Sequence, residues 1–200
     1  MVAWSEIRRY HLNKLIQAIK EDKVDRDILP ILNIINSFDE YVTRSSCYGR
    51  ITFTIEKGLI RKGEGKIINK IHGPVNLEYI KKVSDSVDKG VLWMNIEGTI
   101  IHVASKTYED GLKLYNIALD AGYRESSIYS MSKRGVTIEI LYTTKYSIPI
   151  YSPETGFIIS DEELRSISNY IHNMFIGIEK AKYRLINILS EYKAYEDKYS

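Results

Sequence analysis

The sequence is poor in the residues that mark several common protein classes. It has one cysteine and four prolines among 200 residues. A single cysteine excludes a disulfide within the chain and fits a reducing compartment. No run of 18 apolar residues occurs, and the first residues have no signal-peptide pattern. The sequence therefore predicts a cytoplasmic protein without a membrane-spanning helix.

The common nucleotide-binding and metal-binding signatures are missing as well. There is no G-x-G-x-x-G, no P-loop lysine, no Cys-x-x-Cys and no His-x-x-x-His. The isolated pair Gly63 and Gly65 is typical of a plain hairpin loop. We therefore expect neither a Rossmann-type nucleotide site nor a metal site.

Charge and composition set few limits on function. The formal net charge is +2, so any surface for nucleic acid has to come from local clustering of basic side chains. Apolar residues make up 44% of the chain, which is ordinary for a globular protein. Tyrosine is common, with 16 copies, and its rings either half-bury in a sheet or stack on bases.

Hydrophobic periodicity predicts alternating helices and short strands. Helices are expected over 5–23, from Asp25 or Asp27 to Phe38, after the N-cap Asn76, and from Thr107 to Gly122. Period-two alternation predicts strands over 51–55, 67–72, 91–96, 99–104, 127–132, 136–143 and 146–150. Glu97-Gly98 is typical of a tight turn, which predicts that the strands on either side of it form a hairpin.

A long C-terminal helix is predicted after Ser160, which forms a capping box with Glu163. Apolar residues then recur at alternating spacings of three and four: Leu164, Ile167, Ile171, Met174, Ile178, Ala181, Leu185, Ile188 and Tyr192. Such a stripe needs a partner. The partner is either the N-terminal helix or a second copy of the chain, which would give a homodimer.

These elements predict an α+β fold with a mainly antiparallel sheet flanked by helices and a long C-terminal helix. We expect a single domain over 1–200. Residues 1–38 would form N-terminal helices, 39–158 an α+β core that carries the site, and 159–200 the long helix.

The stretch Tyr41–Ile55 has two different halves. Ile51, Phe53 and Ile55 alternate with polar residues, as in a strand with one buried face. Residues 44–50, RSSCYGR, have no apolar period. Hydroxyls, guanidiniums and a glycine together predict a turn beside an anionic ligand, with Arg44 or Arg50 contacting phosphate or carboxylate.

Several segments resemble the wybutosine-synthesising tRNA methyltransferase family. The resemblance runs from about Ser37 to Pro149, and the motifs occur in the family's order. They are Thr43–Ile51, Lys89–Trp93, Glu97–Val103, Ala118–Ile128 and Arg134–Glu139.

The resemblance implies a specific reaction. Members of this family use S-adenosylmethionine to methylate N-4 of the tricyclic guanosine derivative beside the anticodon of phenylalanine tRNA. The resemblance also implies a fold that is not a Rossmann-type methyltransferase, which agrees with the missing G-x-G-x-x-G motif. The ring nitrogen must lose its proton, so a base within hydrogen-bond reach is needed. His102 is the candidate catalytic base, with a satisfied core histidine as the alternative.

The motifs also supply candidate residues for binding the cofactor or the substrate. We expect Trp93 to wall the methyl pocket or to fill the core, and Glu97 to bind the cofactor or to be a plain turn carboxylate. Arg124 and Arg134 would form a rim facing the tRNA, or a solvated hairpin. The full set is Ser45, Ser46, Cys47, Gly49, Arg50, Trp93, Glu97, Arg124, Ser126, Arg134 and Glu139.

One shared site is predicted from three segments: the Ser45–Arg50 turn, the Trp93–His102 hairpin and the Arg124–Glu139 segment. Two other classes of protein stay open. A non-catalytic RNA-binding module could stack bases on strands around Tyr129 and Tyr142. A thiol enzyme would instead use Cys47.

Overall fold

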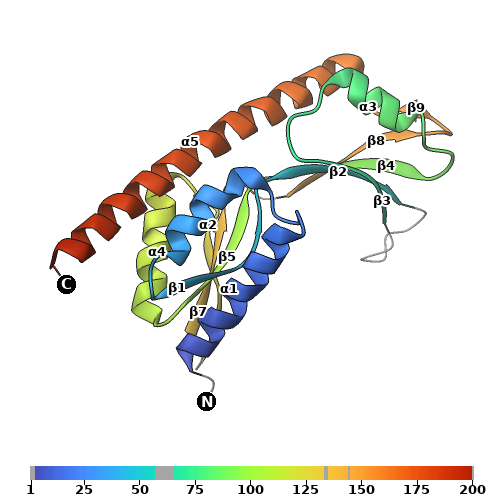
Figure 1. The fold of residues 1–200 in the computed structure, drawn as a ribbon. Coiled ribbons are helices and arrows are strands. Elements are labelled where there is room, and N and C mark those ends of the chain that lie inside the picture. The colour runs from blue at the N-terminus through green and yellow to red at the C-terminus, as the bar shows by residue number, and fades with distance from the viewer. Residues whose placement is uncertain (1–2, 57–64, 133–134, 144, 200) are drawn as a thin grey trace. The chain divides into compact units, whose positions relative to one another are not determined.

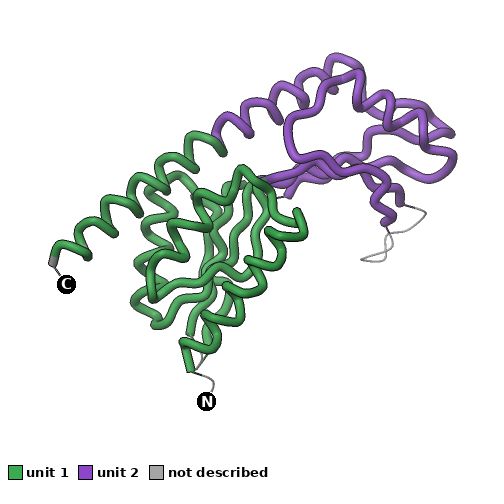
Figure 2. The backbone as a smooth tube through the Cα atoms, in the orientation of Figure 1, with its two compact units in different colours: residues 1–48, 99–143, 178–200 green, residues 49–98, 144–177 purple. Residues whose placement is uncertain are grey.

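The computed structural model describes residues 3–56, 65–132, 135–143 and 145–199. Contacts between residues divide the chain into two compact units (Figure 2). Unit 1 contains Met1–Tyr48, Thr99–Thr143 and Ile178–Ser200, and unit 2 contains Gly49–Gly98 and Thr144–Gly177. The single domain expected from the sequence stays a prediction, and each unit is described by itself.

Unit 1 is built on a four-stranded antiparallel sheet in the order β1-β5-β7-β6. Its helices are α1, the 3-10 helix η1, α2, α4 and the C-terminal part of α5 (Figure 1). The bounds in chain order are α1 Trp4–Lys20, η1 Arg26–Ile28, α2 Leu29–Asn36, β1 Tyr41–Cys47, β5 Ile100–Ser105, α4 Tyr108–Ala121, β6 Ser127–Ser132 and β7 Gly135–Leu141.

Helix α4 covers one face of this sheet, and α1 packs against β1. Thr107 and Asp110 form the predicted capping box, and α4 ends at Gly122, whose φ is 102°. The helix packs on β5, β6 and β7, where Val103 and Ile138 are fully buried. Because side chains alternate along a strand, His102 and Glu139 lie on the opposite face.

Unit 2 is built on a five-stranded antiparallel sheet in the order β3-β2-β4-β8-β9. Asn76 caps its helix α3 as predicted, since the Asn76 side chain accepts a hydrogen bond from the backbone N–H of Tyr79. The bounds are β2 Arg50–Glu56, β3 Lys66–Ile71, α3 Leu77–Ser84, β4 Val91–Glu97, β8 Tyr146–Ser152 and β9 Gly156–Phe157, with the N-terminal part of α5. Gly63, of the predicted hairpin loop, lies outside the described residues.

The predicted hairpin through Glu97-Gly98 is wrong. Strand β4 pairs with β2 and β8, whereas β5 pairs with β1 and β7. Both strands have a neighbour on each edge, so they have no edge left to pair with each other. Gly98 and Thr99 therefore carry the chain from one sheet to the other instead of reversing it.

The predicted Ser45–Arg50 turn is also wrong in extent. Strand β1 continues to Cys47, so only Tyr48 and Gly49 separate it from β2. The register with β5 shifts between Thr43 and Ser45, which marks a β-bulge at Arg44. A bulge interrupts the two-residue alternation, and this is why residues 44–47 show no strand period in the sequence.

Helix α5 runs over Asp161–Tyr199, a length of 39 residues, and begins with the predicted capping box of Ser160 and Glu163. Most of its predicted apolar stripe is buried within the chain itself: Leu164, Ile171, Met174, Ile178, Ala181 and Leu185 are at most 6% exposed. The predicted members Ile167, Ile188 and Tyr192 are only half-buried, and Leu189, which was not predicted, is fully buried. The stripe therefore does not require a second copy of the chain. No helix among the described residues has the length and apolarity needed to cross a membrane.

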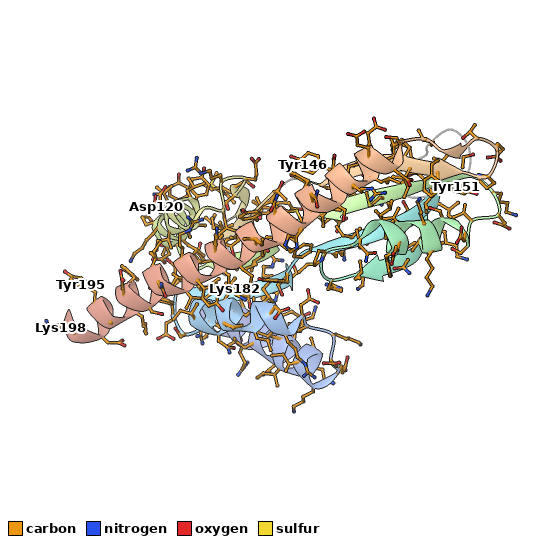
Figure 3. The ribbon with its side chains drawn as sticks, turned by 90° about the horizontal axis from the view of Figure 1, so that it is seen from above. Asp120, Tyr146, Tyr151, Lys182, Tyr195 and Lys198 are labelled. Carbon is orange, nitrogen blue, oxygen red and sulfur yellow. The ribbon has the colours of Figure 1, made fainter. Side chains whose placement is uncertain are left out.

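A partly buried polar cluster lies where α5 packs within unit 1. Lys182 lies on α5 (Figure 3), is 7% exposed, and donates a hydrogen bond of 2.7 Å to Glu179. The Tyr48 hydroxyl donates to the same carboxylate. Burial disfavours the charged carboxylate, but these two hydrogen bonds outweigh burial and lower the pKa of Glu179 below its ordinary value of 4.5.

The architecture confirms the α+β class, the antiparallel pairing and the long C-terminal helix. The β6–β7 hairpin and the helices α1, α2 and α4 also form close to their predicted bounds. Helix α3 begins after Asn76 as predicted but ends at Ser84, six residues before its predicted end near Gly90. The antiparallel strands form two sheets where the sequence suggested one.

Candidate functional site

Three polar residues form a row across the face of the unit 1 sheet opposite α4. Ser45 of β1 lies opposite His102 of β5, and His102 lies opposite Glu139 of β7. Directly opposed residues on neighbouring strands have Cβ atoms about 5 Å apart, which allows side-chain contact. The sheet register thus brings together three residues that are distant in the sequence.

Hydrogen bonds link all three side chains. The Ser45 Oγ–His102 Nδ1 distance is 2.9 Å, and the His102 Nε2–Glu139 Oε1 distance is 3.2 Å. An ionised carboxylate only accepts hydrogen bonds, so the imidazole places its proton on Nε2. In the neutral imidazole the single lone pair of Nδ1 then accepts from the Ser45 hydroxyl, and this lone pair is the site that can take up a proton. The His102 and Glu139 side chains are about one-fifth exposed, at 23% and 19%.

An exposed aromatic ring lies beside this row. The Tyr129 ring centroid is 4.9 Å from that of His102 in an edge-on arrangement, and Tyr129 is 64% exposed. The register between β6 and β7 shifts between Ile128 and Ser130, so Tyr129 occupies a second β-bulge. Bulges re-aim side chains and are common beside active sites. An exposed ring face in this place is suited to stack on a nucleobase.

The first bulge places Arg44 on the same side of the sheet. Arg44 is exposed and donates a hydrogen bond of 3.0 Å from Nη1 to the Thr137 hydroxyl. Two cavities of about 330 and 220 Å³ share Arg44 and His11 among their lining residues. Burial lowers the pKa of His11, and the nearby charges of Arg44 and Lys14 lower it further. Basic side chains therefore lie at both cavities.

Other predicted residues lie in unit 2. Arg50 and Glu97 oppose each other on β2 and β4 and form an ion pair, and Lys145 lies 3.3 Å from the same carboxylate. Trp93 is half-buried on β4, and its indole Nε1 is buried with no hydrogen-bond partner among the described residues. A buried donor without an acceptor is costly, so this N–H is available to a bound ligand.

The remaining predicted residues have mixed surroundings. Ser46 lines the smaller cavity, Cys47 is half-buried at the end of β1, and Gly49 has a φ of 129°, which favours glycine. Arg124 is exposed in the segment after α4. Arg134 lies outside the described residues.

The hydroxyl of Ser126 is engaged by the backbone. It donates to the Tyr123 carbonyl at 2.6 Å and accepts from the Leu141 N–H at 3.1 Å. Ser126 is 8% exposed. Its side chain therefore ties the segment after α4 to the end of β7.

Within unit 1 the fold brings together Ser45, His102 and Glu139 of the predicted set. The sequence analysis missed the contribution of His11 and Lys14, which α1 supplies to the cavities. Their spacing in the sequence is that of any amphipathic helix, and only the packing of α1 against β1 reveals their neighbours. Tyr129 was noted only as a base-stacking residue in the RNA-binding alternative.

Solved structures identify the fold class. The chain is similar to the PH1069 protein of Pyrococcus horikoshii, with 28% identity, a TM-score of 0.85, and coverage of 93% of this chain and 95% of that one. A hypothetical protein of Aeropyrum pernix, at 23% identity and a TM-score of 0.69, shares the fold over 84% of this chain and 98% of that one. The fold is thus shared with known archaeal proteins and differs from the Rossmann-type arrangement.

Sequence comparison gives the family. The family model Methyltransferase TYW3 matches residues 6–191, and the chain belongs to this family. A relative from Thermococcus sibiricus is 36% identical over 141 residues, covering 70% of this chain and 72% of the relative. One from Methanocaldococcus jannaschii is 32% identical over 190 residues, covering 94% and 97%. Both relatives are named tRNA(Phe) 7-((3-amino-3-carboxypropyl)-4-demethylwyosine(37)-N(4))-methyltransferase.

Proposed function

We propose that this protein transfers a methyl group from S-adenosylmethionine to N-4 of the tricyclic wyosine-type base beside the anticodon of phenylalanine tRNA. The reaction belongs to the biosynthesis of wybutosine and related wyosine derivatives. The names of the relatives support the substrate. The single structural observation that carries the proposal is the hydrogen-bonded row of Ser45, His102 and Glu139.

The row fits the proton that this reaction releases. When bound, the sulfonium donor supplies an activated methyl group. The new N–C bond forms as the C–S bond breaks, its electron pair stays on sulfur, and the ring nitrogen gives up its proton. His102 Nδ1 takes up this proton, either directly or through the hydroxyl of Ser45, which lies 2.9 Å away.

Glu139 has a positioning role in this proposal. Its carboxylate accepts the Nε2–H of His102, which fixes the tautomer in which Nδ1 carries the lone pair and acts as the base. The same negative charge stabilises the imidazolium that forms when the proton arrives. A carboxylate that orients a catalytic histidine in this way recurs on unrelated folds.

Tyr129 would hold the tricyclic base against this row. Its exposed ring stands beside His102, and an aromatic contact contributes about 1–3 kcal/mol per stacked base. Arg124, which is exposed, keeps its predicted role as a contact to the tRNA backbone, as does Arg134. A tRNA substrate agrees with the cytoplasmic location expected from the sequence.

The residues present also fit the proposed methyl donor in one respect. The Trp93 N–H is a buried donor without a described acceptor, and a ring nitrogen or ribose oxygen of the adenosine group would satisfy it. The Arg50–Glu97 pair offers charged groups nearby on β2 and β4 for the polar ends of the donor. We propose Trp93, Arg50 and Glu97 as residues that hold the donor.

Methyl transfer can be tested directly. The purified protein is incubated with S-adenosylmethionine carrying a labelled methyl group and with phenylalanine tRNA that bears the base lacking the N-4 methyl. We expect label in the nucleoside beside the anticodon, as resolved by chromatography and mass spectrometry. A folded protein that binds both substrates and transfers no label would overturn the proposal.

A non-catalytic RNA-binding module is the second candidate, and the exposed Tyr129 ring is the observation that favours it. Calorimetry with S-adenosylmethionine separates the two functions, because a module that only binds RNA has no donor site and gives no heat. A thiol enzyme is separated by Cys47→Ser, which would abolish thiol chemistry and leave methyl transfer nearly unchanged.

A further inference from the structure

The smaller of the two cavities lies between α1 and β1 in unit 1 and has a volume of about 220 Å³. Basic side chains line it on both sides: His11, Lys14 and Lys23 from α1 and the segment after it, and Arg44 from β1. Ser45 and Ser46 also line it. None of its described lining residues is acidic, so the cavity offers hydrogen-bond donors and positive charge together.

Two of these cations have no carboxylate partner among the described residues. Lys23 is paired with Glu21 and adds little net charge. Lys14 lies 5.6 Å from the ring centroid of Tyr10, and Arg44 donates to the neutral hydroxyl of Thr137. A guanidinium and an ammonium without counter-charges are the groups that bind an oxyanion most strongly in proteins.

His11, on α1, also lines the cavity and lies near the charges of Arg44 and Lys14. Its Nδ1 atom is buried and has no hydrogen-bond partner among the described residues. Arg44 and Lys14 both lower the pKa of His11, after burial itself. A bound anion would offset these charges and would give the buried nitrogen an acceptor when it is protonated.

The position of the cavity connects it to the row described above. Ser45 lines the cavity and also forms the hydrogen bond to His102. The larger cavity continues from the shared residues His11 and Arg44 toward Ser130 and Thr137, which add two more hydroxyls. A polyanionic strand lying along these cavities therefore passes directly beside the proton-accepting row.

We infer that the Lys14–Arg44 cavity binds a phosphodiester of the RNA strand, next to the nucleotide whose base is modified. This inference rests on the proposed function for the identity of the strand. The phosphodiester is favoured over a single carboxylate because two unpaired cations and several hydroxyls converge on one cavity. The contact fixes the position of the RNA backbone and leaves the base to Tyr129 and His102.

Binding of RNA without turnover tests the inference. The probe is a synthetic, unmodified anticodon stem-loop of phenylalanine tRNA, and its dissociation constant is measured by fluorescence anisotropy over a range of salt concentrations. We expect Lys14→Ala and Arg44→Ala each to weaken binding about five- to tenfold. Each should also reduce the slope of log K against log salt by about 0.7, the value for one contact to single-stranded RNA.

Matched variants serve as controls. Lys20→Ala removes the same charge from the same helix at an exposed position away from the described cavities, and should change affinity less than about twofold. Arg44→Lys retains the charge and should recover most of the affinity. If Lys14→Ala and Arg44→Ala behave like Lys20→Ala, the inference is wrong.

Three further outcomes bear on the nature of the anion. If Arg44→Ala weakens binding of S-adenosylhomocysteine in calorimetry and not that of RNA, the cavity holds the donor's carboxylate and the inference is overturned. If inorganic phosphate binds tightly and both variants leave RNA binding intact, the site is for free phosphate and the inference is overturned as well.

In the unaltered protein, NMR of the His11 imidazole should show its titration moving to higher pH when the stem-loop binds; no movement at saturating RNA contradicts the inference.

These results are independent of methyl transfer. RNA binding is measured without the donor, so a protein that binds the stem-loop through this cavity but transfers no methyl group would refute the proposed function alone. Intact methyl transfer with unchanged RNA binding in both variants would refute the cavity assignment alone.

Discussion

Replacing Glu139 by Gln should slow methyl transfer about tenfold through its effect on His102. The amide keeps a similar shape but loses the negative charge that orients and stabilises the imidazole 3.2 Å away. A hydrogen bond to a charged group contributes about 1.5–3 kcal/mol, and partial exposure of both side chains favours the lower end of that range. Since about 1.4 kcal/mol corresponds to a tenfold change in rate, kcat should fall about tenfold.

His102→Ala removes the base itself. General base catalysis contributes about 10²- to 10⁴-fold, so kcat should fall by that factor while KM for the tRNA changes little. The decisive comparison is the double variant. If Glu139 acts only through His102, then His102→Ala combined with Glu139→Gln is no slower than His102→Ala alone.

The four proteins of this comparison are the unaltered protein, the two single variants and the double variant. Their single-turnover rates of labelled methyl transfer, at saturating donor and tRNA, are free of interference from product release. Glu125→Gln provides a matched control, because Glu125 is an exposed carboxylate in the same unit. Additive effects, with the double variant about tenfold slower than His102→Ala, would refute the shared role of the two residues.

Three predictions concern stability, measured as the free energy of unfolding in urea. Gly135→Ala should cost about 2–4 kcal/mol, because Gly135 has a φ of +117° and a Cβ there would lie 2.4 Å from the Ser105 carbonyl oxygen. Gly65→Ala is the control: a Cβ at Gly65 would make only ordinary contacts, so this change should cost less than half as much. Ser126→Ala should cost about 1–2 kcal/mol, because it leaves the part-buried Leu141 N–H without its hydroxyl acceptor, whereas the Tyr123 carbonyl keeps the backbone N–H of residue 126; a loss as small as that of an exposed serine would contradict the role assigned to this hydroxyl. Glu179→Gln should lower the free energy of unfolding at pH 7, and its difference from the unaltered protein should shrink as the pH falls below 4.5. The reason is that a carboxyl whose pKa is lowered by folding stabilises the protein above its unfolded pKa and loses this effect as it is protonated. A difference that stays constant down to pH 3 would contradict a stabilising role for the negative charge of Glu179.

The helices were predictable because their signals are local. Asn76, Thr107 and Ser160 each accept a hydrogen bond from a backbone N–H at a helix start, and this requires only the neighbouring three residues. The C-terminal stripe was also correct, since its period is a property of the helix alone. What covers the stripe depends on the rest of the fold.

Strand pairing was less predictable because it is decided by distant partners. Glu97-Gly98 has the composition of a hairpin turn, yet β4 pairs with β2 and β8, which lie far from it in sequence. The bulge at Arg44 is equally invisible in the sequence, since its extra residue breaks the alternation that identifies a strand.

The residues of the candidate site were also only partly predictable from the sequence. His102 and Glu139 were found through motifs, because the family resemblance marks both positions. Their direct contact, and that with Ser45, follows only from the register of β1, β5 and β7. His11 and Lys14 had no distinguishing signal, because their environment depends on the packing of α1 against β1.

The most direct test of the account is a structure of the protein with S-adenosylhomocysteine and an anticodon stem-loop carrying the tricyclic base. We expect the base on the Tyr129 ring, with its reacting nitrogen within hydrogen-bond reach of His102 or the Ser45 hydroxyl. A base bound away from this face of the unit 1 sheet, with His102 still joined to Ser45 and Glu139 and touching no substrate atom, would contradict the account.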